Sequence, residues 1–249
     1  MDGKAPEFWD ELVSSIPVCI ELEKNWRKIL QEYLDYAESG NELIPERVLT
    51  SGSMMPMANL TITDSDHDTK QSNSFEQSDV QISGGTKKLY EGTWDVMWAG
   101  TKPKYDAQWG NLKLLEKILY WRTKKGFEEH LEYAQQKFTT FNRIINEFAD
   151  EGQCSAAAFG KLTPGTIINP HFGEGELMRC HLSLINDPKC TLTVGDKSRT
   201  WEEGKILAFK DGRPYMHSVK HAGEQDRLIL MFDFDLTYLR ALFPNTEWL

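Results

Sequence analysis

A run of short segments with β-strand composition dominates the C-terminal part of the chain. Seven such segments occur between residues 155 and 234, with turn sequences between them such as Pro-Gly at 164–165 and Asp-Gly at 211–212. The segments cover residues 155–162, 165–172, 178–185, 190–195, 204–212, 215–222 and 226–234. Short strands separated by turns in this way are typical of an antiparallel sandwich or barrel. We therefore expect two facing sheets, which can bring residues that are distant in the sequence close together.

Helical periodicity marks the part of the chain before these strands. Apolar residues recur at helical spacing over 17–37, and two further helices are predicted over 112–121 and 127–148. The stretch 50–85 is rich in Ser, Thr, Asp, Asn and Gln, and its apolar residues keep no period. Such a composition predicts a flexible insertion. The pattern as a whole predicts an α+β protein.

The change of pattern along the chain suggests a division near residue 110. Residues 1–110 are predicted to form a helical and aromatic region, and residues 111–249 contain further helices followed by the strands. The first region includes Trp94, Trp98 and Trp109, separated by glycines and a proline. Such tryptophans usually pack in a core or between domains. The alternative is that one of them faces a substrate.

Composition excludes several classes of function. The chain has 249 residues and a net charge of -10, and its 28 basic residues form no cluster, which argues against a nucleic-acid partner. No stretch approaches the roughly 20 apolar residues of a membrane span. The four cysteines contain no CxxC pair, which is typical of reduced thiols inside a cell. We expect a cytoplasmic protein, and the oligomeric state stays open.

Two histidines are placed to share a metal ion. His171 lies near the end of the second predicted strand, and His217 lies on the sixth. Facing sheets can bring them together, and two neutral imidazoles can then share one metal ion. Arg227 follows at the start of the seventh strand, where its guanidinium could hold an anion. The plainer alternatives are two histidines satisfied within a core and an arginine that is an ordinary edge charge.

Several spaced motifs resemble a known family. The runs KLTPGTIINPHFGEGELMRCHLSL and TWEEGKILAFKDG, followed by H-x9-R at 217–227, occur in this order. Together they resemble the aspartyl/asparaginyl β-hydroxylase family of iron(II)- and 2-oxoglutarate-dependent oxygenases. The resemblance covers residues 159–235. It implies a double-stranded β-helix, which is a cupin-like jelly roll. Independently of the resemblance, we expect the helical N-terminal half to pack against it.

The resemblance also implies a set of site residues. His171 and His217 match the iron ligands, and Gly173 matches the position at which most relatives in the wider superfamily carry a carboxylate ligand. Arg227 matches the arginine that pairs with the distal carboxylate of 2-oxoglutarate. Arg179 and His181 match residues that line the pocket near the cosubstrate and substrate carboxylates. The implied cofactors are Fe(II), 2-oxoglutarate as cosubstrate, and O2.

Two departures from the family pattern bear on the substrate and cosubstrate. Gly160 stands where family members tend to carry a serine that helps to hold the distal carboxylate, and Leu177 stands where peptide-hydroxylating members tend to carry a further arginine. We therefore expect hydroxylation of an unactivated C–H bond of a small molecule, such as an amino acid, a lipid or a natural-product intermediate, with release of succinate and CO2.

Other functions stay open at this point. They are hydroxylation of an aspartyl or asparaginyl residue in a peptide or protein, a halogenase or a desaturase or cyclase reaction, and a non-catalytic binding module on the same scaffold. His221 matches no motif, and it is predicted to be a histidine at the surface or at a strand end.

Overall fold

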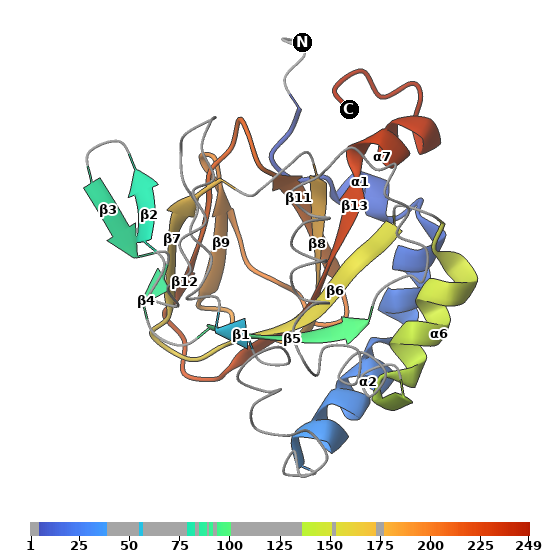
Figure 1. The fold of residues 1–249 in the computed structure, drawn as a ribbon, viewed down its shortest axis with the longest axis horizontal. Helices are drawn as coiled ribbons and strands as arrows, with labels where there is room; N and C mark the ends of the chain where they lie inside the picture. Colours follow the sequence, from blue (N-terminus) through green and yellow to red (C-terminus); the bar gives the residue numbers. More distant parts are fainter. Residues whose placement is uncertain are drawn as a thin grey trace, which may run out of the picture.

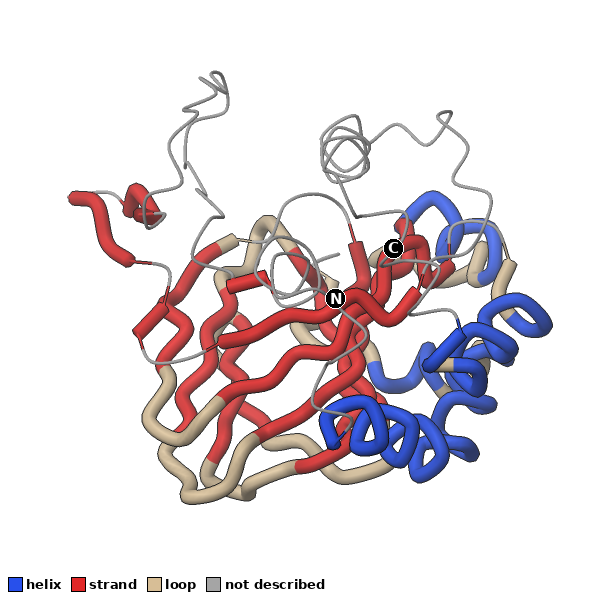
Figure 2. The backbone as a smooth tube through the Cα atoms, turned by 60° about the horizontal axis from the view of Figure 1, so that its bottom comes forward, coloured by secondary structure: helices blue, strands red, loops and turns tan. Residues whose placement is uncertain are grey.

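Eight antiparallel strands in the C-terminal part form two facing sheets. One sheet contains the order β6-β13-β8-β11 and the other the order β10-β9-β12-β7, and Figure 2 shows the two sheets together. The bounds are β6 Gln153–Leu162, β7 Ile167–His171, β8 Leu177–Ile185, β9 Cys190–Val194, β10 Lys197–Arg199, β11 Ile206–Asp211, β12 His217–His221 and β13 Arg227–Asp235. This strand order is that of a double-stranded β-helix, a jelly roll. The predicted fold class is confirmed, and β10 is the strand among these eight that the sequence reading missed.

Further strands come from the region before residue 110. The computed structural model describes residues 5–38, 55–56, 79–82, 85–88, 90–91, 94–100, 136–150, 153–172 and 177–249. The additional strands are β1 Met55–Pro56, β2 Asp79–Ile82, β3 Gly85–Lys88, β4 Tyr90–Glu91 and β5 Trp94–Gly100. β1 and β5 extend the first sheet beyond β6, β4 extends the second beyond β7, and β2 pairs with β3.

These strands correct part of the sequence prediction. Helices and a flexible insertion were expected before residue 110, whereas β5 pairs with β6 along most of its length. The remainder of 50–85, the predicted helix over 112–121 and Trp109 lie outside the described residues, as do the side chains of Trp94 and Trp98. The division of the chain at residue 110 stays a prediction.

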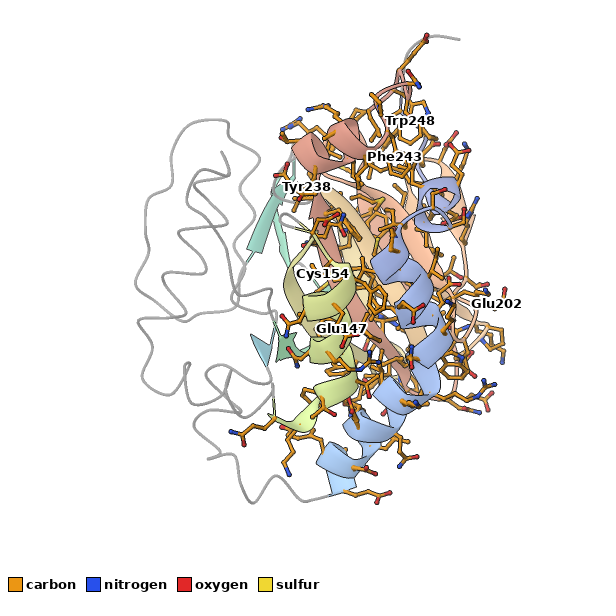
Figure 3. The ribbon with its side chains drawn as sticks, turned by 90° about the vertical axis from the view of Figure 1, so that its right-hand side faces the viewer. Glu147, Cys154, Glu202, Tyr238, Phe243 and Trp248 are labelled. Carbon is orange, nitrogen blue, oxygen red and sulfur yellow. The ribbon has the colours of Figure 1, made fainter. Side chains whose placement is uncertain are left out.

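Two long helices cover the outer face of the six-stranded sheet. α2 (Pro17–Glu38) lies beside α6 (Thr139–Phe148), and both are seen from outside in Figure 3. The predicted helix over 17–37 is confirmed, and α6 is the described part of the one predicted over 127–148. Shorter helices are α1 (Asp10–Val13) and α7 (Leu236–Leu242). None of the helices in the described ranges has both the length and the apolar character needed to cross a bilayer.

The central strands of this sheet are buried on both faces, and the two faces differ in chemistry. In β13, alternate residues from Leu228 to Phe234 pack outward against the helices, in a core that includes Leu22 of α2 and Phe141 of α6. The other residues of β13 face the second sheet, where Ile229 joins a second hydrophobic core. Figure 1 shows the helices on the side of the sheet away from β7, β9 and β12. The outward face is therefore apolar, and the polar residues of β13 lie on the inner face, between the sheets.

The N-terminal segment covers the free edge of this sheet. Phe8 forms a β-bridge with Phe209 of β11, and the Trp9 amide donates to the Ala208 carbonyl oxygen at 2.9 Å. The Trp9 ring also packs on Trp248, with the ring centroids 5.0 Å apart, and Trp248 is labelled near the C-terminus in Figure 3. An uncovered edge strand invites pairing with other chains, so this contact protects the sheet that carries the polar residues of the site.

Candidate active site

His171 and His217 lie directly opposite each other on neighbouring strands. They are Cα partners in the register of β7 and β12, and their ring centroids are 4.1 Å apart. The register of the two strands is irregular just beyond this pair. Both side chains are buried, with 6% of each residue exposed. The two histidines that the sequence predicts to share an ion are therefore brought together.

Each histidine has an oxygen atom facing its Nδ1 atom. The Nδ1 atom of His171 lies 2.7 Å from the Asn169 carbonyl oxygen. Because a carbonyl oxygen only accepts, this nitrogen carries the proton of the neutral ring, and Nε2 keeps its lone pair. The Nδ1 atom of His217 lies 3.5 Å from Asp211 Oδ1, and the carboxylate favours the proton on that nitrogen. Histidines that bind metals are commonly oriented in this way.

Both rings are held in the neutral form that a metal requires. Burial lowers the pKa of His171 to about 4, an effect to which the charge of Arg179 adds and which the Asn169 contact opposes. The pKa of His217 is held well below its ordinary value, first by burial and then by electrostatic interactions with His171 and Arg179 that disfavour a second positive charge. Neutral imidazoles with free Nε2 lone pairs fit a divalent transition metal.

The pair supplies two protein ligands. Within the described residues, no group of three or more His, Cys, Asp or Glu side chains is arranged to hold a metal ion. Gly173 lies outside these residues. A metal held by His171 and His217 would have these two ligands from the described residues, and water or a bound organic acid could take further positions on it.

Arg179 lies on β8 in the facing sheet and is bound by carboxylates. Its Nε and Nη2 atoms donate to the two carboxylate oxygens of Asp233, at 2.9 and 3.0 Å. Its Nη1 atom lies 2.9 Å from Asp211 Oδ2. Since Asp211 also faces His217, a continuous chain of polar contacts joins the histidine pair to β13.

Arg227 lies on β13 and has a different environment. Only 2% of the residue is exposed, and its Nε and Nη1 atoms are buried without a hydrogen-bond partner among the described residues. The guanidinium lies over the Trp201 ring, 4.8 Å from its centroid. Burial lowers the pKa of Arg227 to about 10, and a contact with the Cys190 thiol acts in the opposite direction. The side chain remains charged at neutral pH, and a buried charge of this kind is costly until an anion pairs with it.

Aromatic rings form a series of contacts between Arg227 and the histidine pair. The His181 ring is stacked with Trp201 at 6.0 Å and meets Phe209 edge-on at 5.2 Å, and Phe209 lies 5.3 Å from the His217 ring. Both ring nitrogens of His181 are buried, and neither has a hydrogen-bond partner within the residues described. Burial holds the pKa of His181 well below its ordinary value, and the charges of Arg227 and Arg179 add to this effect. The region between the sheets thus combines two histidines, one unpaired arginine and a neutral third histidine.

The sequence analysis did not predict the acidic members of the site. Asp211 lies within the run TWEEGKILAFKDG but was interpreted as part of an Asp-Gly turn, and Asp233 belongs to no recognised motif and is 54 residues from Arg179. The signal that could have found Asp233 is a charged residue on the inward-facing half of a strand buried on both faces. His221 was predicted at the surface or at a strand end. It ends β12, but only 1% of the residue is exposed, because its ring packs against its own loop and contacts the Gln225 carbonyl oxygen at 2.8 Å.

The fold and the site define a class of protein. Two facing antiparallel sheets in double-stranded β-helix order, with a histidine pair on one and polar residues on the inner face of the other, are typical of cupin-like jelly-roll proteins. Solved structures with similarity include a predicted oxalate decarboxylase from Thermotoga maritima (12% identity, TM-score 0.32, 58% of this chain and 83% of that one). Another is the cupin domain of Cnp3 from Schizosaccharomyces pombe (16% identity, TM-score 0.29, 36% of this chain and 66% of that one).

Sequence comparison places the chain within this class. The family profile for aspartyl/asparaginyl β-hydroxylase matches residues 67–236, and the chain belongs to that family. Aspartate beta-hydroxylase domain-containing protein 2 of Xenopus tropicalis is 40% identical over 81 residues, which are 31% of this chain and 21% of the relative. Aspartyl/asparaginyl beta-hydroxylase of Mus musculus is 31% identical over 94 residues, which are 36% of this chain and 12% of the relative. The matches thus span about a fifth of the length of the first relative and about an eighth of the length of the second.

Proposed function

We propose that this protein is an Fe(II)- and 2-oxoglutarate-dependent oxygenase that hydroxylates an unactivated C–H bond of a small molecule. The observation that carries the proposal is the direct pairing of His171 with His217, each with Nδ1 facing an oxygen atom. In this arrangement the Nε2 atoms would hold Fe(II). The hydroxylase family supports the type of reaction.

The chain's own residues would bind and orient the reactants. Bound iron would supply the activation of O2, coupled to conversion of 2-oxoglutarate to succinate and CO2. Arg227 would pair with the distal carboxylate of 2-oxoglutarate, since its unpartnered nitrogens match a carboxylate. His181 and Arg179 would border the cosubstrate, with Arg179 held in place by Asp233. The apolar surroundings would exclude bulk water and so strengthen these electrostatic contacts.

The small-molecule substrate is proposed from Leu177. This residue begins β8, two positions before Arg179, and is buried with 4% exposed. An apolar side chain at this position offers no partner to an acidic side chain of a peptide. The alternative is a peptide or protein substrate, which the names of the relatives favour.

The proposed location is the cytoplasm. All four cysteines of the chain are buried and free of disulfide bonds, which is the usual state in a reducing compartment.

Turnover of 2-oxoglutarate tests the proposed function. The protein would be incubated with Fe(II), O2, 2-oxoglutarate and either a panel of small molecules or aspartyl peptides, with and without chloride. We expect succinate formation that depends on iron and a small-molecule product that gains one oxygen atom. A gain of chlorine would show a halogenase and a modified peptide would favour the alternative substrate, whereas no succinate from metal-loaded protein across both panels would contradict the proposal.

A further inference from the structure

Ser183 of β8 carries a buried hydroxyl group that the fold does not use. The residue is 0% exposed, and its Oγ atom has no hydrogen-bond partner among the residues that the structure describes. The same holds for two neighbouring side chains, since Trp201 Nε1 and the Nε and Nη1 atoms of Arg227 are also buried without partners in the described part of the chain. Buried polar groups are nearly always hydrogen-bonded in folded proteins. Several unpartnered donors in one part of the core therefore indicate a ligand.

The strand register places Ser183 on the same face as Arg227. β13 lies between β6 and β8, and its residue Ile229 is opposite Ser183 on one side and Gly160 on the other. Residues directly opposite each other in antiparallel strands point to the same face, and so do residues two apart in one strand. Ser183, Ile229, Gly160 and Arg227 thus share the inner face of the sheet.

Backbone contacts bring Trp201 to the same place. The Ser183 carbonyl oxygen accepts from the Gly204 amide at 2.8 Å, and the Ser183 amide donates to the Lys205 carbonyl oxygen at 3.0 Å. These bonds attach Ser183 to the turn that follows Trp201, whose ring in turn lies against the Arg227 guanidinium. The hydroxyl, the indole N–H and the guanidinium thus belong to three segments of the chain that these contacts join.

The chemistry of this group selects its ligand. The indole and the guanidinium only donate, and the hydroxyl can donate, so together they match an acceptor with several lone pairs. A water molecule would satisfy some of these donors but would leave the buried charge of Arg227 uncompensated. A carboxylate accepts from all of them and neutralises the charge.

We infer that Ser183 positions the cosubstrate by donating a hydrogen bond from Oγ to the distal carboxylate of 2-oxoglutarate, beside Arg227, with Trp201 Nε1 as a further donor. This inference rests on the proposed function, because it takes 2-oxoglutarate to be the cosubstrate. Ser183 of β8 and Gly160 of β6 lie on either side of Ile229 in the sheet. The hydroxyl of Ser183 is therefore at the same level of the sheet as Gly160.

The test compares Ser183→Ala with a matched control, Ser198→Ala, in which the serine lies on the exposed strand β10. Binding of 2-oxoglutarate to Mn(II)-loaded protein is measured without O2 by calorimetry, and binding of glutarate is measured on metal-free protein. Glutarate keeps the distal carboxylate and lacks the keto group that would bind a metal. Ser183→Ala should weaken both by about 10-fold or more, as expected for a hydrogen bond to a charged group, and Ser198→Ala should change neither.

Two further measurements separate positioning from a structural role. The ligand-free Ser183→Ala protein should be as resistant to urea as the wild type, because the lost hydroxyl had no partner. Gly160→Ser introduced into Ser183→Ala should recover affinity, because it returns a hydroxyl to the same level of the sheet. Unchanged binding in Ser183→Ala, or a loss of stability that accompanies weaker binding, would overturn the inference.

The outcome for the wild type distinguishes the two proposals. If the Mn(II)-loaded wild type binds 2-oxoglutarate and Ser183→Ala binds it equally well, the role of Ser183 is refuted and the proposed function stands. If the wild type binds neither 2-oxoglutarate nor glutarate, the proposed function is refuted and the inference with it.

Discussion

Arg179 and Arg227 lie on the same inner face of one sheet, and they differ in whether their guanidinium groups have carboxylate partners. Arg179 meets two aspartates, and Asp233 takes both Nε and Nη2. Arg227 is more deeply buried, and two of its nitrogens have no hydrogen-bond partner in the described part of the chain. The first arginine completes a network of ion pairs within the protein, whereas the second is the one that we propose to bind an anion.

The presence or absence of ion-pair partners distinguishes a buried arginine that stabilises the fold from one that binds a ligand. Removing one partner of a buried ion pair leaves the other uncompensated, so a paired arginine contributes to stability. An unpaired buried arginine costs stability in the free protein and regains it on binding. We therefore expect a substitution of Arg179 to lower mainly the stability of the fold and a substitution of Arg227 to lower mainly the affinity for the ligand.

The largest expected effect falls on the histidine pair, which lies on the sheet opposite the two arginines. His171→Ala or His217→Ala should weaken Mn(II) or Fe(II) binding by at least about 100-fold, since each removes half of the protein's ligands. Calorimetric titration of the metal under nitrogen measures this. His221→Gln is the matched control, because His221 is equally buried but contacts its own loop. Metal affinity that survives in both alanine variants would refute the ligand assignment.

Replacing Arg179 should mainly affect folding. Arg179→Met leaves Asp211 and Asp233 buried without their cation, and we expect the free energy of unfolding to fall by about 3–5 kcal/mol in urea denaturation. Arg143→Met is the control, because Arg143 forms an exposed pair with Glu147 and should cost less than about 1 kcal/mol. A loss for Arg179→Met as small as that of the control would remove the distinction between the two arginines.

Replacing Arg227 should mainly affect binding. Arg227→Met removes an uncompensated buried charge and keeps an apolar contact with Trp201, so the stability of the ligand-free protein should stay equal or increase. The affinity of the Mn(II)-loaded protein for 2-oxoglutarate should fall by about 100-fold, as expected when a charged hydrogen-bonding partner is lost. Stability that drops with unchanged affinity would reverse the roles of the two arginines.

The smallest predicted effect is a dependence of stability on pH. His171 has a folded pKa of about 4, below its ordinary value of 6.5. The unfolded chain therefore binds more protons in this range, so stability is highest above pH 6.5 and falls as the pH approaches 4. His171 alone should account for about 2 kcal/mol between pH 7 and pH 5. Urea denaturation of metal-free protein at both pH values, with His171→Asn as comparison, measures this, and equal pH dependence in the two proteins would contradict it.

The sequence predicted the β-sheet core well because its signals are local. Alternation of side chains and turn residues identified seven strands, whereas β10 was missed because its three residues are exposed and polar. β4 and β5 were missed because their pairing partners, β7 and β6, lie far along the chain. Pairing between distant segments has no signature in either segment taken alone.

The candidate site was predictable in the residues that belong to motifs. The proximity of His171 and His217 followed from the spacing of strands, and their direct pairing agrees with it. The ion pairs of Arg179 could not be foreseen, because Asp211 and Asp233 come from two other strands. The sequence also could not show whether Arg227 would have an ion-pair partner, because that depends on which side chains the two sheets place beside it.

A crystal structure of the protein with Mn(II) and 2-oxoglutarate tests the central claim most directly. We expect Mn(II) on the Nε2 atoms of His171 and His217, and the distal carboxylate against Arg227 with Arg179 still bound to Asp233. Mn(II) bound away from the histidine pair, or a distal carboxylate that binds Arg179 and leaves Arg227 without a partner, would contradict the account.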